Sequence, residues 1–262
     1  MEVAVERIIK AIENKEKVLN KFAAIGVPIY HTIGNHETDS CSLKDAVNFL
    51  EMERDYYSFE YSNIKFIVLN SCYFGKDGEE EPYYKRNYRG EGSVYPIIPM
   101  DEFEWLRNEL DDGKKYIIFL HHSLVNEFRD RGISNRKEVR ELFEDKDVLL
   151  CVNGHDHGDD FSVLENVPYY TVNSAAYMWC GAQISSSEKL REKYAELHGM
   201  LMYQQAFCAT IEIEDNEIRI NGIEGAYLSV TPEDVGICDY QWNGVSVQPQ
   251  TSSHVIRLSK EC

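Results

Sequence analysis

The segment that decides the fold is DVLLCVNGHDH at residues 147–157, in which an apolar run ends in a glycine and two histidines. A nearly uninterrupted apolar run followed by polar turn residues is typical of a strand buried on both faces of a sheet. A second such run, KYIIFL at 115–120, ends in His121 and His122. Residues 134–143, between the two runs, begin with a serine that can cap a helix. Strands that alternate with helices predict an α/β fold with its site at the carboxyl ends of parallel strands.

Outward from these strands, apolar periodicity predicts the remaining elements. Before residue 115 they are an amphipathic helix over 3–25, a strand at Val27–Ile33, a helix over Leu43–Met52, a hairpin of strands 56–61 and 64–71, and a helix opened by a capping box at Asp101 and Glu104. Beyond residue 157 they are strands over 167–173 and 207–213, a hairpin over 212–220, and a helix over 183–204. The later strands predict a second, all-β sheet.

The chain shows neither an internal repeat nor a linker, so we expect a single domain over residues 1–262. Residues 73–98 hold several Gly, Pro and Tyr residues with mixed charge and no periodicity, which predicts a surface insertion. The tyrosines of this segment either stack on a base or sugar of a substrate or serve as ordinary packing residues.

Composition and charge exclude several classes of protein. The 262 residues carry 27 Lys and Arg against 45 Asp and Glu, a formal net charge of −18, which leaves no basic surface for bulk nucleic-acid binding. No apolar stretch approaches the ~18 residues of a membrane span, and the first residues lack the apolar segment of a signal peptide, so we expect a soluble, cytoplasmic protein. The seven cysteines are odd in number and form no C-x-x-C, which predicts reduced, structural thiols.

Polar clusters follow three of the predicted strands. They are Gly34-Asn35-His36-Glu37, His121-His122-Ser123 and Gly154-His155-Asp156-His157, and six of the eight histidines lie in or beside them. Each cluster by itself is also what a turn with a solvated imidazole looks like. Neutral imidazoles and an Asn oxygen are ligands for Mn, Fe, Co or Zn, and loops after adjacent strands converge on one point. Together the clusters predict a metal site.

The G-N-H-E, H-x-S and G-H-x-H blocks, in this order, resemble those of the calcineurin-like metallophosphoesterases, from about residue 3 to residue 175. Within that family, HTIGNHE, YYSFEYSNIKFIVLNS and CVNGHDH are most similar to the ADP-ribose/CDP-alcohol diphosphatase type. The resemblance implies a four-layer sandwich of two mixed sheets flanked by helices, with a centre of two divalent metal ions, manganese, iron or zinc.

The same resemblance implies a role for each polar residue of the clusters. Asn35, His121 and His155 would bind one metal and His157 the other. Asn35 and His36 would face the substrate phosphate, and His36 would donate a proton to the leaving oxygen. His122 would lie behind the ligands, and Glu37 is either an acceptor that holds the His36 ring or a solvated carboxylate. Three further carboxylates either lie behind the ligands or belong to an acidic surface without a special role: Asp156, Asp159 and Asp160.

The sequence departs from the family pattern at its start. The D-x-H and G-D-x-x-D blocks, which supply an Asp and a His for one metal and the Asp that bridges both, are not found. Four of seven family ligands can therefore be matched. We expect a fold that lacks its first strand–helix units, in an N-terminally truncated chain whose unpaired sheet edge favours self-association.

Two functions follow from these observations. The first is a metal-dependent hydrolase of a small phosphomonoester, phosphodiester or diphosphate, with a binuclear centre that is incomplete in this chain. The second is a catalytically inactive remnant that acts as a binding module. The net charge of −18 opposes anionic substrates at long range, so we expect the local positive field to come from the metals.

Overall fold

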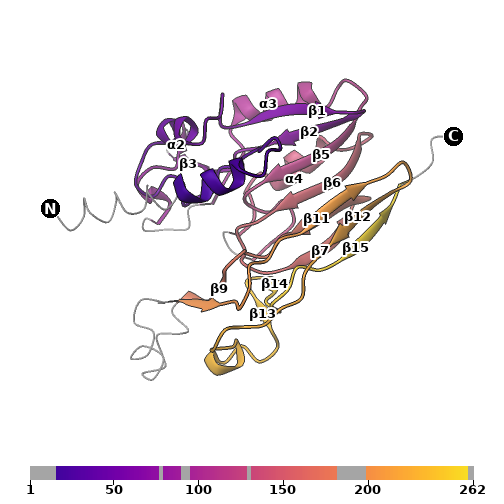
Figure 1. Ribbon diagram of the computed structural model, residues 1–262. Helices are drawn as coiled ribbons and strands as arrows, with labels where there is room; N and C mark the ends of the chain where they lie inside the picture. The colour runs from indigo at the N-terminus through magenta and orange to yellow at the C-terminus, as the bar shows by residue number, and fades with distance from the viewer. Residues whose placement is uncertain (1–15, 77–78, 90–94, 129–130, 182–198, 259–262) are drawn as a thin grey trace.

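A six-stranded mixed sheet forms the centre of the protein (Figure 1). The computed structural model describes residues 16–76, 79–89, 95–128, 131–181 and 199–258. The central strands lie in the order β1-β2-β5-β6-β8-β7. Their bounds are Tyr57–Tyr61 (β1), Ile64–Val68 (β2), Lys115–Leu120 (β5), Asp147–Asn153 (β6), Asp160–Leu164 (β7) and Val167–Thr171 (β8). Strands β2, β5, β6 and β8 run parallel, and antiparallel β1 and β7 form the edges.

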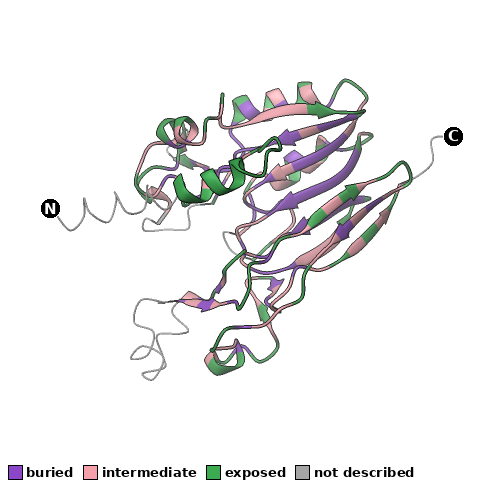
Figure 2. Cartoon of the chain, viewed as in Figure 1, coloured by how far each residue is buried: buried purple, intermediate pink, exposed green. Residues whose placement is uncertain are grey.

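Side chains that alternate along β5 pack on opposite faces of this sheet. Tyr116 and Ile118 belong to a core shared with helices α3 and α4, whereas Ile117 packs against Ile218 and Ile220 of a second sheet. The second sheet is antiparallel, in the order β11-β12-β15. The bounds are Met100–Glu109 (α3), Arg136–Glu141 (α4), Thr210–Ile213 (β11), Glu217–Asn221 (β12) and His254–Arg257 (β15). Figure 2 shows the buried residues concentrated in the central strands.

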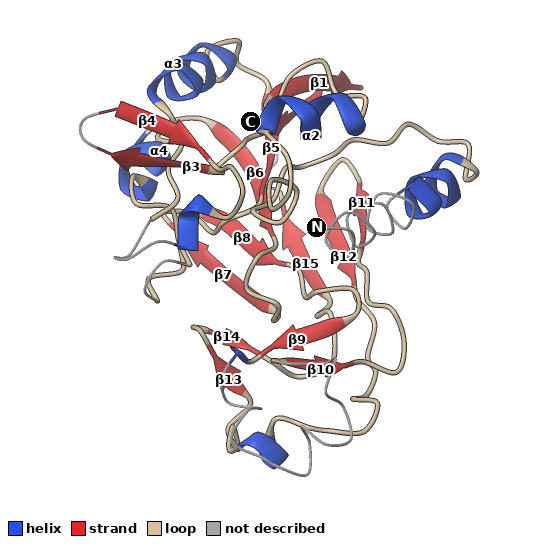
Figure 3. Ribbon diagram, turned by 90° about the vertical axis from the view of Figure 1, so that its left-hand side faces the viewer, coloured by secondary structure: helices blue, strands red, loops and turns tan. Residues whose placement is uncertain are grey.

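Short elements complete the described structure. They are α2 (Leu43–Phe49), β3 (Tyr73–Lys76), β4 (Glu79–Pro82), η1 (Asn87–Arg89), β9 (Tyr177–Trp179), β10 (Met200–Met202), η3 (Glu233–Val235), β13 (Gln241–Trp242) and β14 (Val245–Ser246). Figure 3 shows β9, β10, β13 and β14 gathered at one end of the molecule, where they enclose a separate small core. Within the described ranges, every helix is too short or too polar to cross a membrane.

The fold confirms the predicted α/β class with a central mixed sheet. Strand β5 begins and ends at the predicted residues, and the hairpin of β1 and β2 forms around the predicted turn. Residues 73–98 contain the β3–β4 hairpin, and Tyr83 of this segment is buried in a core with Ile33 and Phe74. The single domain and the surface insertion remain predictions.

Two predictions about helices were wrong. Asp101 and Glu104 form no capping box, because α3 begins one residue earlier, after Pro99, which offers no side-chain acceptor. Residues 200–202, predicted as helix, form β10, paired with β9; the rest of that predicted helix, up to residue 198, lies outside the described residues. Residues 16–23 are helical as predicted, and the earlier part of that helix also lies outside the description.

Val27–Ile33, predicted as a strand, is an extended segment without strand pairing in the described structure. A run of β-prone residues becomes a strand only where a neighbour satisfies its N–H and C=O groups. Here the contacts are made by side chains instead: Tyr30 stacks on Phe59 of β1, and the Tyr57 hydroxyl donates to the carbonyl of His31. The segment still delivers buried Ile33 and the following loop to the end of β5.

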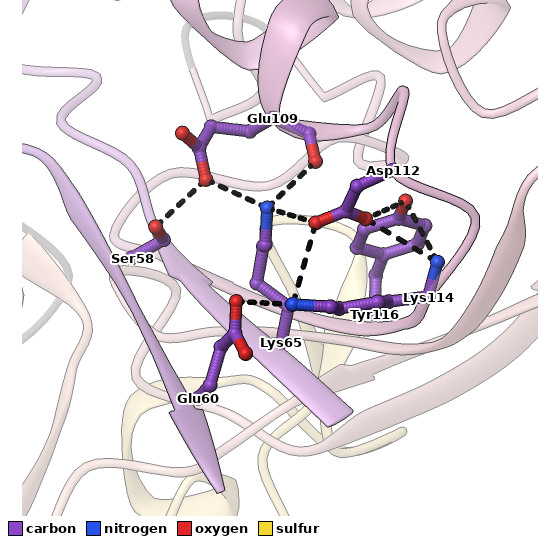
Figure 4. A network of polar contacts seen from close by, with 7 residues as sticks. All are labelled: Ser58, Glu60, Lys65, Glu109, Asp112, Lys114 and Tyr116. Carbon is purple, nitrogen blue, oxygen red and sulfur yellow. Dashed lines mark hydrogen bonds and ion pairs between the residues drawn. The ribbon is translucent and has the colours of Figure 1, made fainter. Parts of the chain in front are cut away.

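A buried lysine ties the first hairpin to the end of α3 (Figure 4). Lys65 of β2 places its ammonium 2.5 Å from Asp112 Oδ2 and 3.1 Å from Glu109 Oε2, and it also donates to the Glu109 carbonyl. The Tyr116 hydroxyl donates to the other oxygen of Asp112. Because burial of an unpaired ammonium is unfavourable, these acceptors determine how α3 meets the sheet.

Candidate metal centre

Three side chains from distant parts of the sequence converge beyond the carboxyl ends of β5 and β6. His121 Nε2 lies 2.8 Å from Asn35 Oδ1 and 3.2 Å from His155 Nδ1. His121 directly follows β5, and His155 follows β6 after one glycine, so the parallel pairing of these strands brings their loops together. The convergence that the strand-end argument predicted is therefore present.

The spacing of these donor atoms suits a divalent metal. Ligand atoms about 2.0–2.2 Å from a tetrahedral metal lie roughly 3.3–3.6 Å from one another. The two distances measured from His121 Nε2 fall just below that range, so a small outward movement of the donors would admit an ion. Two imidazole nitrogens and one amide oxygen fit Mn, Fe, Co or Zn.

Burial keeps these imidazoles neutral. Burial, reinforced by the charges of His157 and His36, lowers the pKa of His121 to about 3. Burial also lowers the pKa of His155 and of His122 well below the usual value of 6.5. A neutral imidazole offers a lone pair on one nitrogen and keeps its hydrogen on the other, so a metal would displace no proton from these rings at pH 7.

His157 lies outside this group, and a backbone contact fixes the orientation of its ring. Its Nδ1 lies 3.1 Å from the backbone carbonyl of Tyr177, which can only accept, so the ring hydrogen is on Nδ1 and the lone pair is on Nε2. Burial lowers the pKa of His157 to about 4. Both His155 and His157 have positive φ angles, 66° and 52°, an uncommon conformation that the G-H-D-H loop needs in order to turn both rings inward.

His36 stands at the more exposed side of the centre, with about half of its side chain accessible. Its Nδ1 lies 2.9 Å from Asp39 Oδ2. The same carboxylate contacts the Arg86 guanidinium at 2.9 Å and accepts from the Tyr88 hydroxyl at 2.6 Å. Burial raises the pKa of Asp39, but the hydrogen bonds from Tyr88 and His36 outweigh it and leave the pKa below its usual value. An ionised carboxylate therefore holds the His36 ring.

Neither of the two interpretations left open for Glu37 describes its contact in the structure. Glu37 accepts from the backbone N–H of Gly34 at 2.9 Å and so shapes the loop, while Asp39 contacts the ring. Sequence reasoning missed Asp39, although its position three residues after His36 is a spacing at which neighbours in a turn meet. It also missed Ser71, whose hydroxyl lies 2.8 Å from His122 Nδ1.

The aspartates near the histidines face other groups. Asp156 accepts from the Asn126 side chain, and Asp159 accepts from the backbone N–H of Ser252. Among the described residues, the group of His, Cys, Asp and Glu side chains close enough to hold a metal contains only His121, His122 and His155. Among the described residues these donors form one group that could hold a metal ion, and His157 lies outside it.

An open cavity of about 400 Å³ lies beside the centre. Its lining includes three histidines and three apolar side chains: His121, His155, His157, Phe119, Val152 and Val172. This volume is within the usual range for small-molecule sites. A compact organic phosphate could therefore approach the histidines from this side.

Comparisons with known proteins agree with this geometry. The calcineurin-like phosphoesterase family model matches residues 7–159. Among solved structures, a dimetal phosphatase from Danio rerio is similar with a TM-score of 0.56 and 17% identity, over 86% of this chain and 80% of that one. GAP50, the anchor in the inner membrane complex of Plasmodium, has a TM-score of 0.41 and 15% identity, over 80% of this chain and 56% of that one. No curated protein sequence matches the chain.

At 17% identity the Danio rerio structure shows a shared fold alone. The family match is more informative, because it covers more than half of the chain and includes all three loops that carry the candidate donors. The chain belongs to the calcineurin-like phosphoesterase family, and is by that membership a metal-dependent phosphoester hydrolase.

Proposed function

We propose that the protein hydrolyses a small phosphoester at a centre in which Asn35, His121 and His155 hold one divalent metal ion. The observation that carries this proposal is the convergence of their three donor atoms around His121 Nε2. When bound, a divalent metal would polarise the phosphoryl group and neutralise its negative charge. His157, with its lone pair on Nε2, would serve a second metal, whose other ligands the described residues do not supply.

We propose that His36 is the general acid. Asp39 accepts from Nδ1 and so orients the ring, which leaves Nε2 available to deliver a proton to the leaving oxygen. The exposure of His36 leaves this nitrogen accessible to a substrate. Asp39 is itself positioned by Tyr88 and Arg86, so residues of the 73–98 segment support the acid.

The substrate class is a phosphomonoester, phosphodiester or diphosphate. The similarity to the ADP-ribose/CDP-alcohol diphosphatase type favours a diphosphate. Arg86 adds support, because its guanidinium shares Asp39 Oδ2 with His36 and is more than half exposed. A cation at this point could meet a negatively charged leaving group.

The test is turnover combined with metal analysis. The full chain, loaded with Mn²⁺, Zn²⁺ or Co²⁺, should hydrolyse a nitrophenyl phosphodiester or a dinucleoside diphosphate. His121→Ala should lose both bound metal and activity, whereas His36→Ala should lose activity and keep its metal. His254→Gln, which changes a histidine outside the centre, is the matched control. Equal loss of metal and activity in His36→Ala would show that His36 is a ligand.

One observation favours the alternative of an inactive binding module. No carboxylate of the described residues joins the histidine group, so the charge neutralisation that two bound metals need is incomplete there. In that case the protein would bind inorganic phosphate or a nucleotide without turning it over. Metal content of one ion or less per chain, with phosphate binding and no hydrolysis, would support the module and refute the hydrolase.

A further inference from the structure

A third histidine lies against the proposed ligands. One nitrogen each of His121, His122 and His155 lie within 4.8 Å of one another. The His122 ring centroid is 4.2 Å from that of His155 and 4.9 Å from that of His121. With Asn35, ligation by His122 would make four protein ligands, the number typical of closed structural sites, whereas catalytic sites keep three and leave one position open. The protonation state of the His122 ring nitrogens, which sets whether His122 can bind the metal, therefore decides whether the site is closed or keeps an open position.

The hydrogen bonds of Ser71 determine that state. Its hydroxyl is fully buried and makes two contacts among the described residues, both with His122. The backbone N–H of His122 donates to Oγ at 3.3 Å, and His122 Nδ1 lies 2.8 Å from the same oxygen. If Nδ1 carried the ring hydrogen, Oγ would accept twice and its own hydrogen would be buried without an acceptor, at a cost of about 1–3 kcal/mol. If the hydroxyl donates to Nδ1, every group is satisfied.

We infer that Ser71 holds His122 as the Nε2–H tautomer, outside the metal's ligand set. In that tautomer the lone pair of Nδ1 is occupied by the Ser71 hydroxyl, and Nε2 carries a hydrogen, so neither nitrogen has a free pair for a metal. The centre then has three protein ligands and an open position for substrate. Ser71 is thus a positioning residue that keeps the site open, a role that rests on the proposed metal-dependent function.

The backbone around Ser71 makes its hydroxyl a fixed partner. Asn70 N–H donates to the buried Glu102 Oε1 at 2.8 Å, and Cys72 N–H donates to Asn70 Oδ1 at 2.9 Å. The Asn70 side-chain amide also donates to Asp55 Oδ2. Both neighbours of Ser71 are therefore anchored, which fixes the Ser71 backbone beside His122.

The experiment reads the tautomer directly. Long-range ¹H–¹⁵N spectra of the metal-free full chain near pH 7 should show His122 protonated on Nε2. Ser71→Thr keeps a hydroxyl and should preserve this pattern, whereas Ser71→Ala should shift His122 toward the Nδ1–H form. Ser58→Ala, which removes a hydroxyl that donates to Glu109, is the control and should leave His122 unchanged. A wild-type His122 protonated on Nδ1 would overturn the inference.

Metal binding gives a second readout. In Ser71→Ala, His122 gains a free lone pair, so Co²⁺ should bind about 10-fold more tightly or more, the scale on which partners of ligating histidines act. Inorganic phosphate should then bind the Co²⁺ form more weakly, because the open position is filled. Unchanged Co²⁺ and phosphate affinities in Ser71→Ala would refute the open-site role. If the wild type bound no metal at all, the proposed function would fail while the tautomer spectra would still decide this inference.

Discussion

The geometry of the histidine centre depends on the absence of a Cβ at Gly34. A Cβ at this position would lie 2.8 Å from His121 Cε1, 2.9 Å from His121 Nδ1 and 2.9 Å from Glu37 Oε2. Ordinary contacts begin at 3.4 Å, so Gly34→Ala requires the His121 ring to retreat by about 0.6 Å or more. The ring has little room, because it packs against the rings of His122 and His155.

The displacement acts on the proposed metal ligand itself. A shift of this size moves Nε2 away from Asn35 Oδ1 and His155 Nδ1, and a misplacement of about 1 Å in a catalytic constellation costs up to ~100-fold in rate. We expect Gly34→Ala to reduce kcat/KM by roughly 10–100-fold, to weaken metal binding, and to lower the free energy of unfolding by about 1–3 kcal/mol through overpacking.

Gly75 provides the matched control. A Cβ on Gly75 of β3 would meet no atom within 4 Å, so Gly75→Ala should leave activity, metal affinity and melting temperature nearly unchanged. The assays are steady-state hydrolysis of a nitrophenyl phosphodiester, Co²⁺ titration and thermal unfolding of the two variants. If Gly34→Ala matched Gly75→Ala in all three, the His121 ring would not be fixed by this contact, and the proposed ligand geometry would be wrong.

Four further outcomes can be measured. Asp39→Asn removes the carboxylate that orients the His36 ring, so kcat should fall roughly 10–100-fold at constant metal content, which turnover and metal analysis together would show. Lys65→Met leaves Glu109 and Asp112 without their ammonium and should lower the free energy of unfolding in urea by about 1–3 kcal/mol. Burial raises the pKa of Asp112, but hydrogen bonds from Lys65 and Tyr116 outweigh it and depress the pKa below 3.8. The ionised carboxylate therefore stabilises the fold above about pH 4, and this stabilisation is lost as the pH falls further. Asp112→Asn should flatten this part of the curve of unfolding free energy against pH. Saturation with metal at about 100 times its Kd should stabilise the protein by about 2.7 kcal/mol, and a chelator should abolish the gain.

The strands of the central sheet could be predicted because they are buried on both faces. KYIIFL and the run that ends at Asn153 carry an apolar residue at nearly every position, a pattern that does not depend on distant partners. Val27–Ile33 has a similar composition, but its state depends on a neighbouring strand, which local sequence does not encode. The capping box failed for a related reason, since the start of α3 is set by how the chain leaves Pro99 rather than by the nearest acidic residue.

The residues of the candidate site could likewise be predicted only in part. His121 and His155 were predicted because strand ends of one sheet converge, a property of the fold class. Asn35 joins them although the segment before it, Val27–Ile33, forms no strand of that sheet. Asp39 and Ser71 act through hydrogen bonds whose geometry depends on loop conformation, so no residue pattern singled them out. The role assigned to Glu37 shows the same limit: adjacency to His36 suggested a contact, and the turn directed the side chain to Gly34 instead.

Strand register explains why Ser71 meets His122 and not another residue of its loop. Val68 of β2 pairs with Phe119 of β5, and three residues further on Ser71 lies beside His122. Leu120 of β5 pairs with Asn153 of β6, and two residues further on the His122 ring lies beside that of His155. Ser71, His122 and His155 thus continue one row across three parallel strands. A one-residue slip would turn every side chain to the other face of the sheet. The apolar packing that sets the register of β2, β5 and β6 therefore also places the Ser71 hydroxyl beside His122.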